Sequence, residues 1–264
     1  MLSGLKVIEF EGLGPAPFAG MMLADLGADV IVIHRETADK SPAHARHNLL
    51  DRGKRSIVLN LKNADEKQLA HRLACQADGL IEGFRPGVME RLGLGPEDVM
   101  HVNPRLVYGR VTGWGQTGPL AQAAGHDLNY LARSGGLWYA SNAGETPFPP
   151  PTLLGDIGGG ALYLMIGILA ALLSQRTTGK GAVIDAAMVD GTSHMLSLLM
   201  SLQGPGGLVK ERGKSLLDGP HFSRTYACRG GGYISVQCLE PQFYAAFLRK
   251  LDLQEDADFC KQFE

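Results

Sequence analysis

Short apolar segments alternate with helix-like segments through the first half of the chain, and this alternation constrains the fold more than any other feature of the sequence. Strands that alternate with helices are typical of βαβ units, in which successive strands run parallel and the helices cover the sheet. We therefore predict an α/β fold with a Rossmann-like large domain built on a parallel sheet. The expected strands are Leu5–Phe10, Asp29–Ile33, Ile57–Leu61, Gly79–Glu82, Leu106–Val111 and Ala182–Ala186. The expected helices are Phe18–Leu26, Ala64–Ala77, Pro96–Val102, and two long apolar segments, Asp156 to Gln175 and Val189 to Leu202.

The pattern changes after the break at residues 204–207 (Gly-Pro-Gly-Gly). Two strand-like segments, Thr225–Cys228 and Tyr233–Cys238, flank a glycine turn and predict a hairpin, and Pro241–Leu251 predicts a helix. We predict a large domain at residues 1–204 and a linker with a small α+β domain at residues 205–264. The small domain is too short to bury much core alone, so we expect it to dock on the large domain or on a partner chain.

Composition narrows the class of protein. The chain has 25 basic and 27 acidic residues and a net charge of −2, which argues against nucleic-acid or membrane-surface binding, because both need a basic excess. The uncharged stretch 157–175 opens with glycines, and its densest part is short, so we expect a buried core helix rather than a membrane span. The N-terminus shows no signal-peptide core, and we expect a cytoplasmic protein.

Cysteines and histidines predict neither disulfides nor a metal site. The cysteines have neither the spacing of a disulfide framework nor a CxxC pair, and the histidines form no ligand spacing with cysteines or acids. The cysteines are Cys75, Cys228, Cys238 and Cys260; the histidines other than His126 are His34, His44, His47, His71, His101, His194 and His221.

The turn at residues 12–17 (GLGPAP) lies where a Rossmann phosphate loop would lie, after the first strand and before a helix. Pro17 occupies the third glycine position of that loop, and the second strand ends in His34-Arg35 rather than in an acid. An acid there holds a ribose hydroxyl, whereas an arginine suits a phosphate, so the pattern disfavours NAD and favours a phosphorylated ribose. Further cations follow, which also fit a solvated surface of mixed charge: Arg52, Lys54, Arg55, Lys62, Arg85 and Arg91.

Two short motifs carry groups that could react. In residues 125–130 (GHDLNY), His126 precedes an expected helix start, where Asp127 lies near the cap and free backbone N–H groups could hold an oxyanion. In residues 155–160 (GDIGGG), Asp156 opens the apolar helix among glycines that allow a ligand to come close. An imidazole and a carboxylate in one cleft form an acid/base pair. The plainer interpretation, a capping aspartate and a structural histidine, stays open at this point.

Together these segments resemble the family III CoA-transferases, and within them the α-methylacyl-CoA racemase branch. The stretches that carry the resemblance are Gly12–Val30, Gly53–Ile57, Glu82–Gly95, Asn103–Tyr108, Gly113–Gly118, Gly125–Tyr130, Gly155–Gly160, Gly179–Gly191 and Glu240–Tyr244.

The resemblance implies binding of an acyl-CoA substrate, with coenzyme A as part of that substrate and no separate cofactor. It implies that His126 and Asp156 interconvert (2R)- and (2S)-2-methylacyl-CoA by 1,1-proton transfer through an enolate, with the backbone N–H of Asp127 on the thioester oxygen. It also implies that Glu240 supports the histidine across the interface of an interlocked homodimer. The implied CoA contacts are Arg35, Lys62 and Arg91, with Arg55 and Arg85 beside them.

The transferase branch of the family offers the alternative. There the aspartate that matches Asp156 is a nucleophile that becomes an aspartyl-CoA thioester, and a different residue, often tyrosine, occupies the place of His126. The histidine therefore favours the racemase branch. The chain departs from the racemase pattern at Thr152, where that branch usually carries an asparagine that holds the aspartate.

Overall fold

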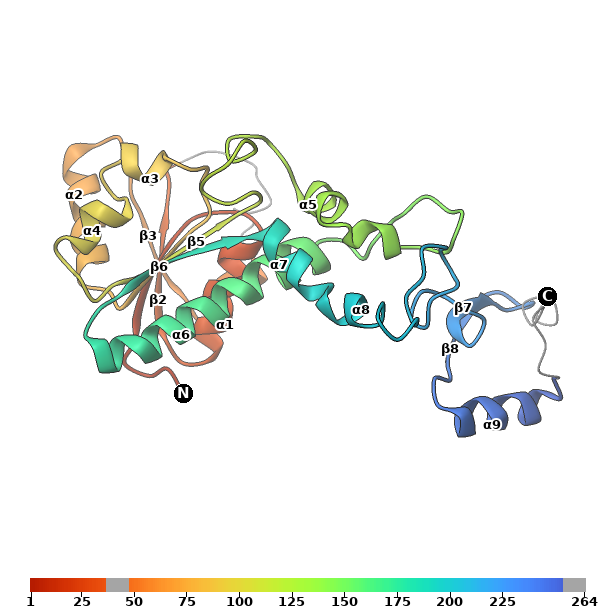
Figure 1. Cartoon of the computed structure of the whole chain (residues 1–264). Helices are drawn as coiled ribbons and strands as arrows, with labels where there is room; N and C mark the ends of the chain where they lie inside the picture. The colour runs from red at the N-terminus through yellow and green to blue at the C-terminus, as the bar shows by residue number, and fades with distance from the viewer. Residues whose placement is uncertain (37–47, 254–264) are drawn as a thin grey trace. The chain divides into compact units, whose positions relative to one another are not determined.

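A six-stranded parallel sheet forms the centre of the computed structural model, which describes residues 1–36 and 48–253 (Figure 1). The strand order is β3-β2-β1-β4-β5-β6, the order of the doubly wound Rossmann fold. The predicted α/β class with a parallel sheet is confirmed. The strands are β1 (Lys6–Phe10), β2 (Asp29–His34), β3 (Arg55–Val58), β4 (Gly79–Glu82), β5 (Val107–Thr112) and β6 (Ala182–Ala187).

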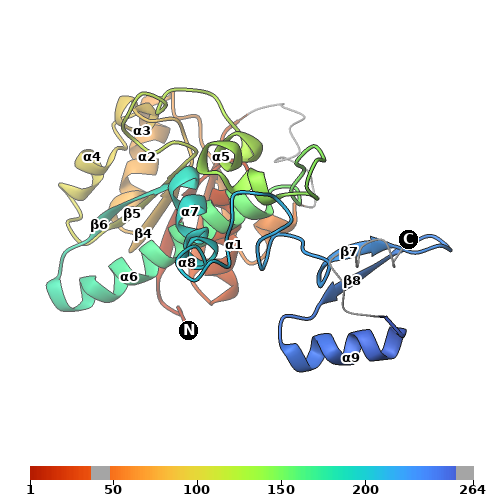
Figure 2. The same ribbon diagram turned by 45° about the vertical axis from the view of Figure 1, so that its right-hand side comes forward.

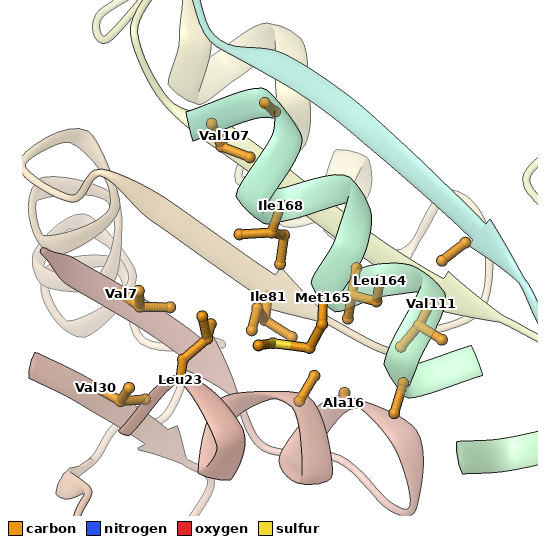
Figure 3. Close-up of a cluster of buried hydrophobic side chains, with 14 of the residues drawn as sticks. Val7, Ala16, Leu23, Val30, Ile81, Val107, Val111, Leu164, Met165 and Ile168 are labelled. Atoms are coloured by element: carbon orange, nitrogen blue, oxygen red, sulfur yellow. The ribbon is translucent and has the colours of Figure 1, made fainter. Parts of the chain in front are cut away.

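Alternating side chains of the strands feed two buried clusters, one on each face of the sheet. On one face Val7 and Ile81 pack with α1 (Pro15–Asp25) and α6 (Leu162–Thr178) (Figure 3). Both helices lie along the same face of the sheet (Figure 2). On the other face Ile8 and Leu80 pack with the helices α2 (Ala64–Cys75), α3 (Val88–Arg91) and α4 (Pro96–Met100). Each fully buried aliphatic side chain of this kind contributes about 1.5–3 kcal/mol to folding.

The third strand begins and ends earlier than predicted. Instead of Ile57–Leu61, β3 spans Arg55–Val58, because it pairs with β2 from Arg55 opposite Ile31 to Val58 opposite His34. Pairing with the neighbouring strand, rather than the local apolar run, sets the ends of this edge strand.

The first long apolar helix starts differently from the prediction. Its first part, η4 (Leu153–Ala161), is a π-helix in which the Ile157 N–H donates to the Thr152 carbonyl (3.0 Å), and α6 follows it. Glycines permit this wider turn to pack closely against the helix that begins at Met188, since a Cβ on Gly159 would lie 2.7 Å from the Met188 carbonyl oxygen. By length and composition the run Leu153–Thr178 could cross a membrane. Half of its apolar window is buried, and α6 packs on the sheet as expected for a core helix.

The second long apolar helix is interrupted. Instead of one helix over 189–202, the chain forms α7 (Met188–Met195) and α8 (Ser197–Ser201), with Leu196 between them. At this point the chain passes from one compact unit to the other. The first unit comprises Met1–Gly136 and Pro150–Met195, and the second comprises Leu137–Pro149 and the chain from Leu196 onward. The domain boundary predicted at residue 204 stays a prediction.

The second unit contains the predicted hairpin and helix. Strands β7 (Ser223–Ala227) and β8 (Tyr233–Gln237) pair antiparallel, and α9 spans Pro241–Leu251. Arg212 links the early segment of this unit to the later one, because it binds Asp218 (2.9 Å) and the Ser141 carbonyl (2.6 Å).

The remaining helices of the described residues are α5 (Asp127–Ser134) and the short 3-10 turns η2 (Leu49–Asp51) and η3 (Gly136–Tyr139).

Candidate active site

A cavity of about 550 Å³ lies at the carboxyl ends of the parallel strands, and its lining belongs entirely to the first unit. In open α/β sheets ligands bind at this edge, where the strand order reverses, here between β1 and β4. The lining comes from the segments after all six strands, together with the start of α5 and Asp156. The segments are Phe10–Pro15, Ile33–Arg35, Leu59 and Leu61, Gly83–Pro86, Val111–Trp114 and Met188.

The first loop brings its backbone close to the Asp156 carboxylate. Gly14 caps α1 with a positive φ of 67°, and Pro15 occupies the first turn. A Cβ on Gly14 would lie 3.6 Å from Asp156 Oδ2. A glycine here therefore satisfies the left-handed turn and also leaves the space in front of the carboxylate open.

Glu11 organises the end of β2, a role that sequence reasoning missed. Its carboxylate accepts from the Arg35 backbone N–H (2.9 Å) and from Arg35 Nε (3.3 Å), and it contacts His34 Nδ1 (3.2 Å). The Glu11 side chain is buried, whereas that of Arg35 is 64% exposed at the cavity. The guanidinium is thus anchored at one edge and still has donors for a phosphate.

An ionic network around buried Glu82 and Arg110 holds the loop after β4. Glu82 accepts from the Phe84 N–H (2.7 Å) and from Arg110 Nε (2.7 Å), and Arg110 also binds both oxygens of Glu90 (2.7 and 3.2 Å). Burial raises the pKa of Glu82, whereas the Arg110 hydrogen bond lowers the pKa of Glu90. The network fixes the backbone of Phe84 and Arg85, both of which line the cavity.

The predicted cations are brought together only in part. Arg35 and Arg85 line the cavity, and exposed Lys62 directly follows the lining residue Leu61. Arg91, at the end of α3, is exposed outside the lining. Arg55 binds Asp29 (2.8 and 2.5 Å).

Arg55 is the first residue of β3, and Asp29 is the first residue of β2. The ion pair of Arg55 and Asp29 therefore lies at the amino end of the sheet, opposite the cavity.

His126 lines the cavity as the cap of α5. Its N–H donates to Asn129 Oδ1 (3.0 Å), and its carbonyl accepts from the Asn129 and Tyr130 N–H groups (2.8 and 3.3 Å). The N–H groups of Asp127 and Leu128 come first in the helix, where backbone donors have no intrahelical acceptor. The predicted helix start is confirmed, and it presents the imidazole beside free donors.

Asp156 also lines the cavity, from the π-helical turn of η4. The pKa of its carboxyl is raised to about 6, mainly by burial and also by the negative charge of Asp127, while His126 acts in the opposite direction. A carboxylate with a pKa near 6 is still ionised at neutral pH and is a stronger base than an exposed one. The structure therefore brings His126 and Asp156 to one cavity, where the pKa of the Asp156 carboxyl is raised toward neutrality.

Thr152 and Glu240, which the sequence also singled out, do not line the cavity. Thr152 caps η4 with a φ of 62°, a left-handed conformation that asparagine adopts more readily than a β-branched residue. Glu240 is the exposed cap of α9 in the second unit, and its support of the histidine stays a prediction. Among residues 1–36 and 48–253, no group of three His, Cys, Asp or Glu could hold a metal ion. Cys260, His44 and His47 lie outside the described residues.

Comparison with known proteins identifies the family of the chain. A family model described as CoA-transferase family III matches residues 2–264. The chain is 45% identical to the alpha-methylacyl-CoA racemase of Mus musculus and 43% identical to that of Homo sapiens, over 97% of its own length. It spans 66% of the length of each of these relatives. Among solved structures, a CAIB/BAIF family protein from Brucella suis has a TM-score of 0.80 at 30% identity, with 98% of this chain and 72% of that chain covered.

Proposed function

The chain belongs to CoA-transferase family III, and from this premise we propose that it is a racemase that interconverts (2R)- and (2S)-2-methylacyl-CoA thioesters. The observation that carries the proposal is the placement of His126 and Asp156 on one cavity, with the pKa of Asp156 raised to about 6. The names of its mouse and human relatives support the same activity.

In the proposed reaction one group removes the proton on the carbon alpha to the thioester, and the other returns a proton to the opposite face. When Asp156 is the base, its carboxylate takes the α-proton and His126 donates the replacement; the reverse direction exchanges the two roles. The intermediate is an enolate, whose charge gathers on the thioester oxygen. The backbone N–H of Asp127 is the proposed donor to that oxygen, and loss of one such donor typically costs about 2.7–4 kcal/mol of transition-state stabilisation.

The nucleotide end of coenzyme A is proposed to bind along the cations at the carboxyl edge of the sheet. Arg35 and Arg85 line the cavity. Lys62 lies in the loop between β3 and α2, and Arg91 is the last residue of α3. Arg55, which is engaged with Asp29, stays a prediction. Coenzyme A enters only as part of the substrate, so no separate cofactor is proposed.

Exchange of the α-proton tests the activity. We expect (2R)-2-methyldecanoyl-CoA in deuterated water to lose its α-proton NMR signal when the protein is added without an acceptor acid. His126→Ala should lower the exchange rate by about 10²-fold or more, because an acid/base group typically contributes that much. His101→Ala, an exposed histidine at the end of α4, is the matched control and should keep the rate. Full exchange by His126→Ala contradicts the assignment.

The same assay separates the transferase alternative, in which Asp156 is a nucleophile. Its accessibility from the cavity and the open space before Gly14 favour keeping this alternative. A transferase would form an aspartyl-CoA thioester, which hydroxylamine or borohydride would trap on Asp156, and would transfer CoA only when an acceptor acid is present. Trapping without exchange would replace the racemase proposal.

We also propose that the protein acts as a homodimer in the cytoplasm. The free thiols of Cys75, Cys228 and Cys238 suit a reducing compartment. If Glu240 supports the partner's imidazole, a mixture of His126→Ala and Glu240→Gln chains restores one complete site per mixed dimer, and activity exceeds that of either variant alone. Activity no higher than the average of the two variants contradicts the shared site.

A further inference from the structure

The side chain of Asp127 connects the two motifs that carry the proposed proton-transfer groups. Its Oδ1 atom accepts from the backbone N–H groups of Gly155 (2.9 Å) and Asp156 (2.9 Å). Asp127 is the first residue of α5 and directly follows His126, the cap of that helix. One carboxylate oxygen therefore joins the start of α5 to the turn that carries Asp156.

Gly155 permits this approach. A Cβ on Gly155 would lie 2.6 Å from Asp127 Oδ1 and 3.3 Å from the Asp127 carbonyl oxygen. The Asp127 side chain is itself buried, with 7% of the residue exposed. The glycine before Asp156 is thus explained by residues 125–130, whose Asp127 carboxylate packs against this backbone.

Asp127 also acts on Asp156 by its charge. Burial is the largest cause of the raised pKa of Asp156, the Asp127 charge adds to it, and His126 lowers it. The helix α7 packs against η4 and carries two titratable residues, Asp190 and His194. The His194 ring contacts the Tyr163 hydroxyl (2.6 Å). On α5, Tyr130 also lines the cavity, and its pKa is raised first by burial and then by the charge of Asp156.

We propose that Asp127 is a positioning residue that couples the two reacting groups: it locks the backbone of Asp156 to the residue after His126 and keeps a second negative charge beside the Asp156 carboxylate. This inference rests on the proposed function for its kinetic consequence. The titration of Asp156 is its direct consequence and does not depend on turnover.

Asp127→Asn tests the role of the charge, because the amide keeps an acceptor oxygen of the same shape. In protein labelled with ¹³C at the aspartate carboxyl, the Asp156 signal is assigned by its loss in Asp156→Asn. We expect its titration midpoint to lie near pH 6 in the wild type and about one pH unit lower in Asp127→Asn. The acid limb of the exchange rate should move by the same amount, whereas KM should stay unchanged.

Asp78→Asn is the matched control. Asp78 Oδ2 also accepts a backbone N–H from a distant segment, that of Lys6 (2.9 Å), but Asp78 directly precedes β4, at the amino end of the sheet. This variant should leave the Asp156 midpoint unchanged. An equal midpoint in wild type and Asp127→Asn, or an equal fall in Asp78→Asn, overturns the proposal.

Asp127→Glu tests the geometry separately and covers the case in which Asp127→Asn does not fold. It keeps the charge but moves the oxygen, so we expect an unchanged midpoint and an exchange kcat lower by about 10²-fold, the usual result of a misplacement near 1 Å. A wild-type kcat in Asp127→Glu overturns the positioning role. If the titration midpoints of Asp156 move as expected but neither the wild type nor the variants exchange the α-proton, the racemase proposal is wrong. The effect of Asp127 on Asp156 is then still supported.

Discussion

Asp156 is half-buried in the cavity wall, and its environment favours the protonated form. Because burial raises its pKa from 3.8 to about 6, the folded state binds a proton that the unfolded state releases between these values. The stability that this proton provides is fully present below pH 3.8 and is lost as the pH rises through 6. The Asp156 carboxylate therefore lowers the stability of the fold at neutral pH.

Asp156→Asn should reveal this effect, because the amide does not titrate. Relative to the wild type, we expect the variant to gain about 1–2 kcal/mol of unfolding free energy between pH 4 and pH 7, a value reduced for the partial exposure of the carboxyl. Urea unfolding at both pH values measures the gain. The same difference at pH 4 and pH 7 would mean that the folded environment does not disfavour the carboxylate.

Arg35 is the cation that the structure places best for a ribose phosphate, since Glu11 anchors its Nε while the rest of the guanidinium is exposed. Arg35→Ala should weaken binding of CoA by about 10-fold and that of dephospho-CoA much less, because one charge-assisted hydrogen bond contributes roughly 1.5–3 kcal/mol. Calorimetry with both ligands measures the ratio. Arg105→Ala, whose guanidinium contacts Gln175, is the control. Equal losses for both ligands exclude the phosphate role.

At this scale the sequence identified the groups that project into the cavity but not the groups that hold them. His126, Asp156 and Arg35 follow motifs or strand ends, and a local pattern is enough to single them out. Glu11 and the Asp127 side chain act on residues 24 and 28 positions away, respectively. Such contacts depend on how segments meet in space, and no local pattern encodes that meeting.

Among the elements, β1 and α1 are joined through Lys54, which precedes β3 and forms a buried ion pair with Glu9 of β1. Glu9 and Lys54 are each 1% exposed, their charged atoms lie 2.7 Å apart, and Lys54 Nζ also donates to the Pro17 carbonyl in the first turn of α1 (2.9 Å). Burial raises the pKa of Glu9 despite the neighbouring ammonium group. The pair therefore fixes α1, and with it the cavity loop, without adding much net stability.

A double-mutant cycle tests this interpretation. Glu9→Gln and Lys54→Met should each lower the free energy of unfolding by about 3–5 kcal/mol, because each leaves a buried charge without its partner. The double variant should lose less than either single variant, since no charge remains buried. Urea unfolding of the four proteins measures the coupling. Additive losses would show that the two groups do not act as a pair.

Element types followed from the sequence better than element ends. All six strands predicted for the parallel sheet exist, because each carries an apolar run between turn residues, and α9 has the predicted bounds. The π-helical start of η4 and the interruption at Leu196 were not predicted, because both depend on packing. Gly159 presses on α7, and Leu196 lies where the chain changes units.

On the scale of the whole molecule, the cavity lining and the second unit have no residue in common. Every residue that lines the cavity lies in the first unit. Within the second unit, Arg212 binds buried Asp218 and the Trp138 and Ser141 carbonyls, and it stacks on the Trp138 ring at 5.5 Å. One side chain thus holds together two segments of this unit that are far apart in the sequence.

Arg212→Ala should therefore loosen the second unit and leave nucleotide binding intact. We expect faster amide hydrogen exchange in residues 137–149 and 212–218, because each lost hydrogen bond to a charged group removes roughly 1.5–3 kcal/mol and Asp218 is left unpaired. The Kd for CoA should change less than about 2-fold. Arg229→Ala, an exposed arginine in the hairpin turn, is the control and should alter neither quantity. A large loss of CoA affinity in Arg212→Ala would show that the first unit needs the second in order to form its cavity.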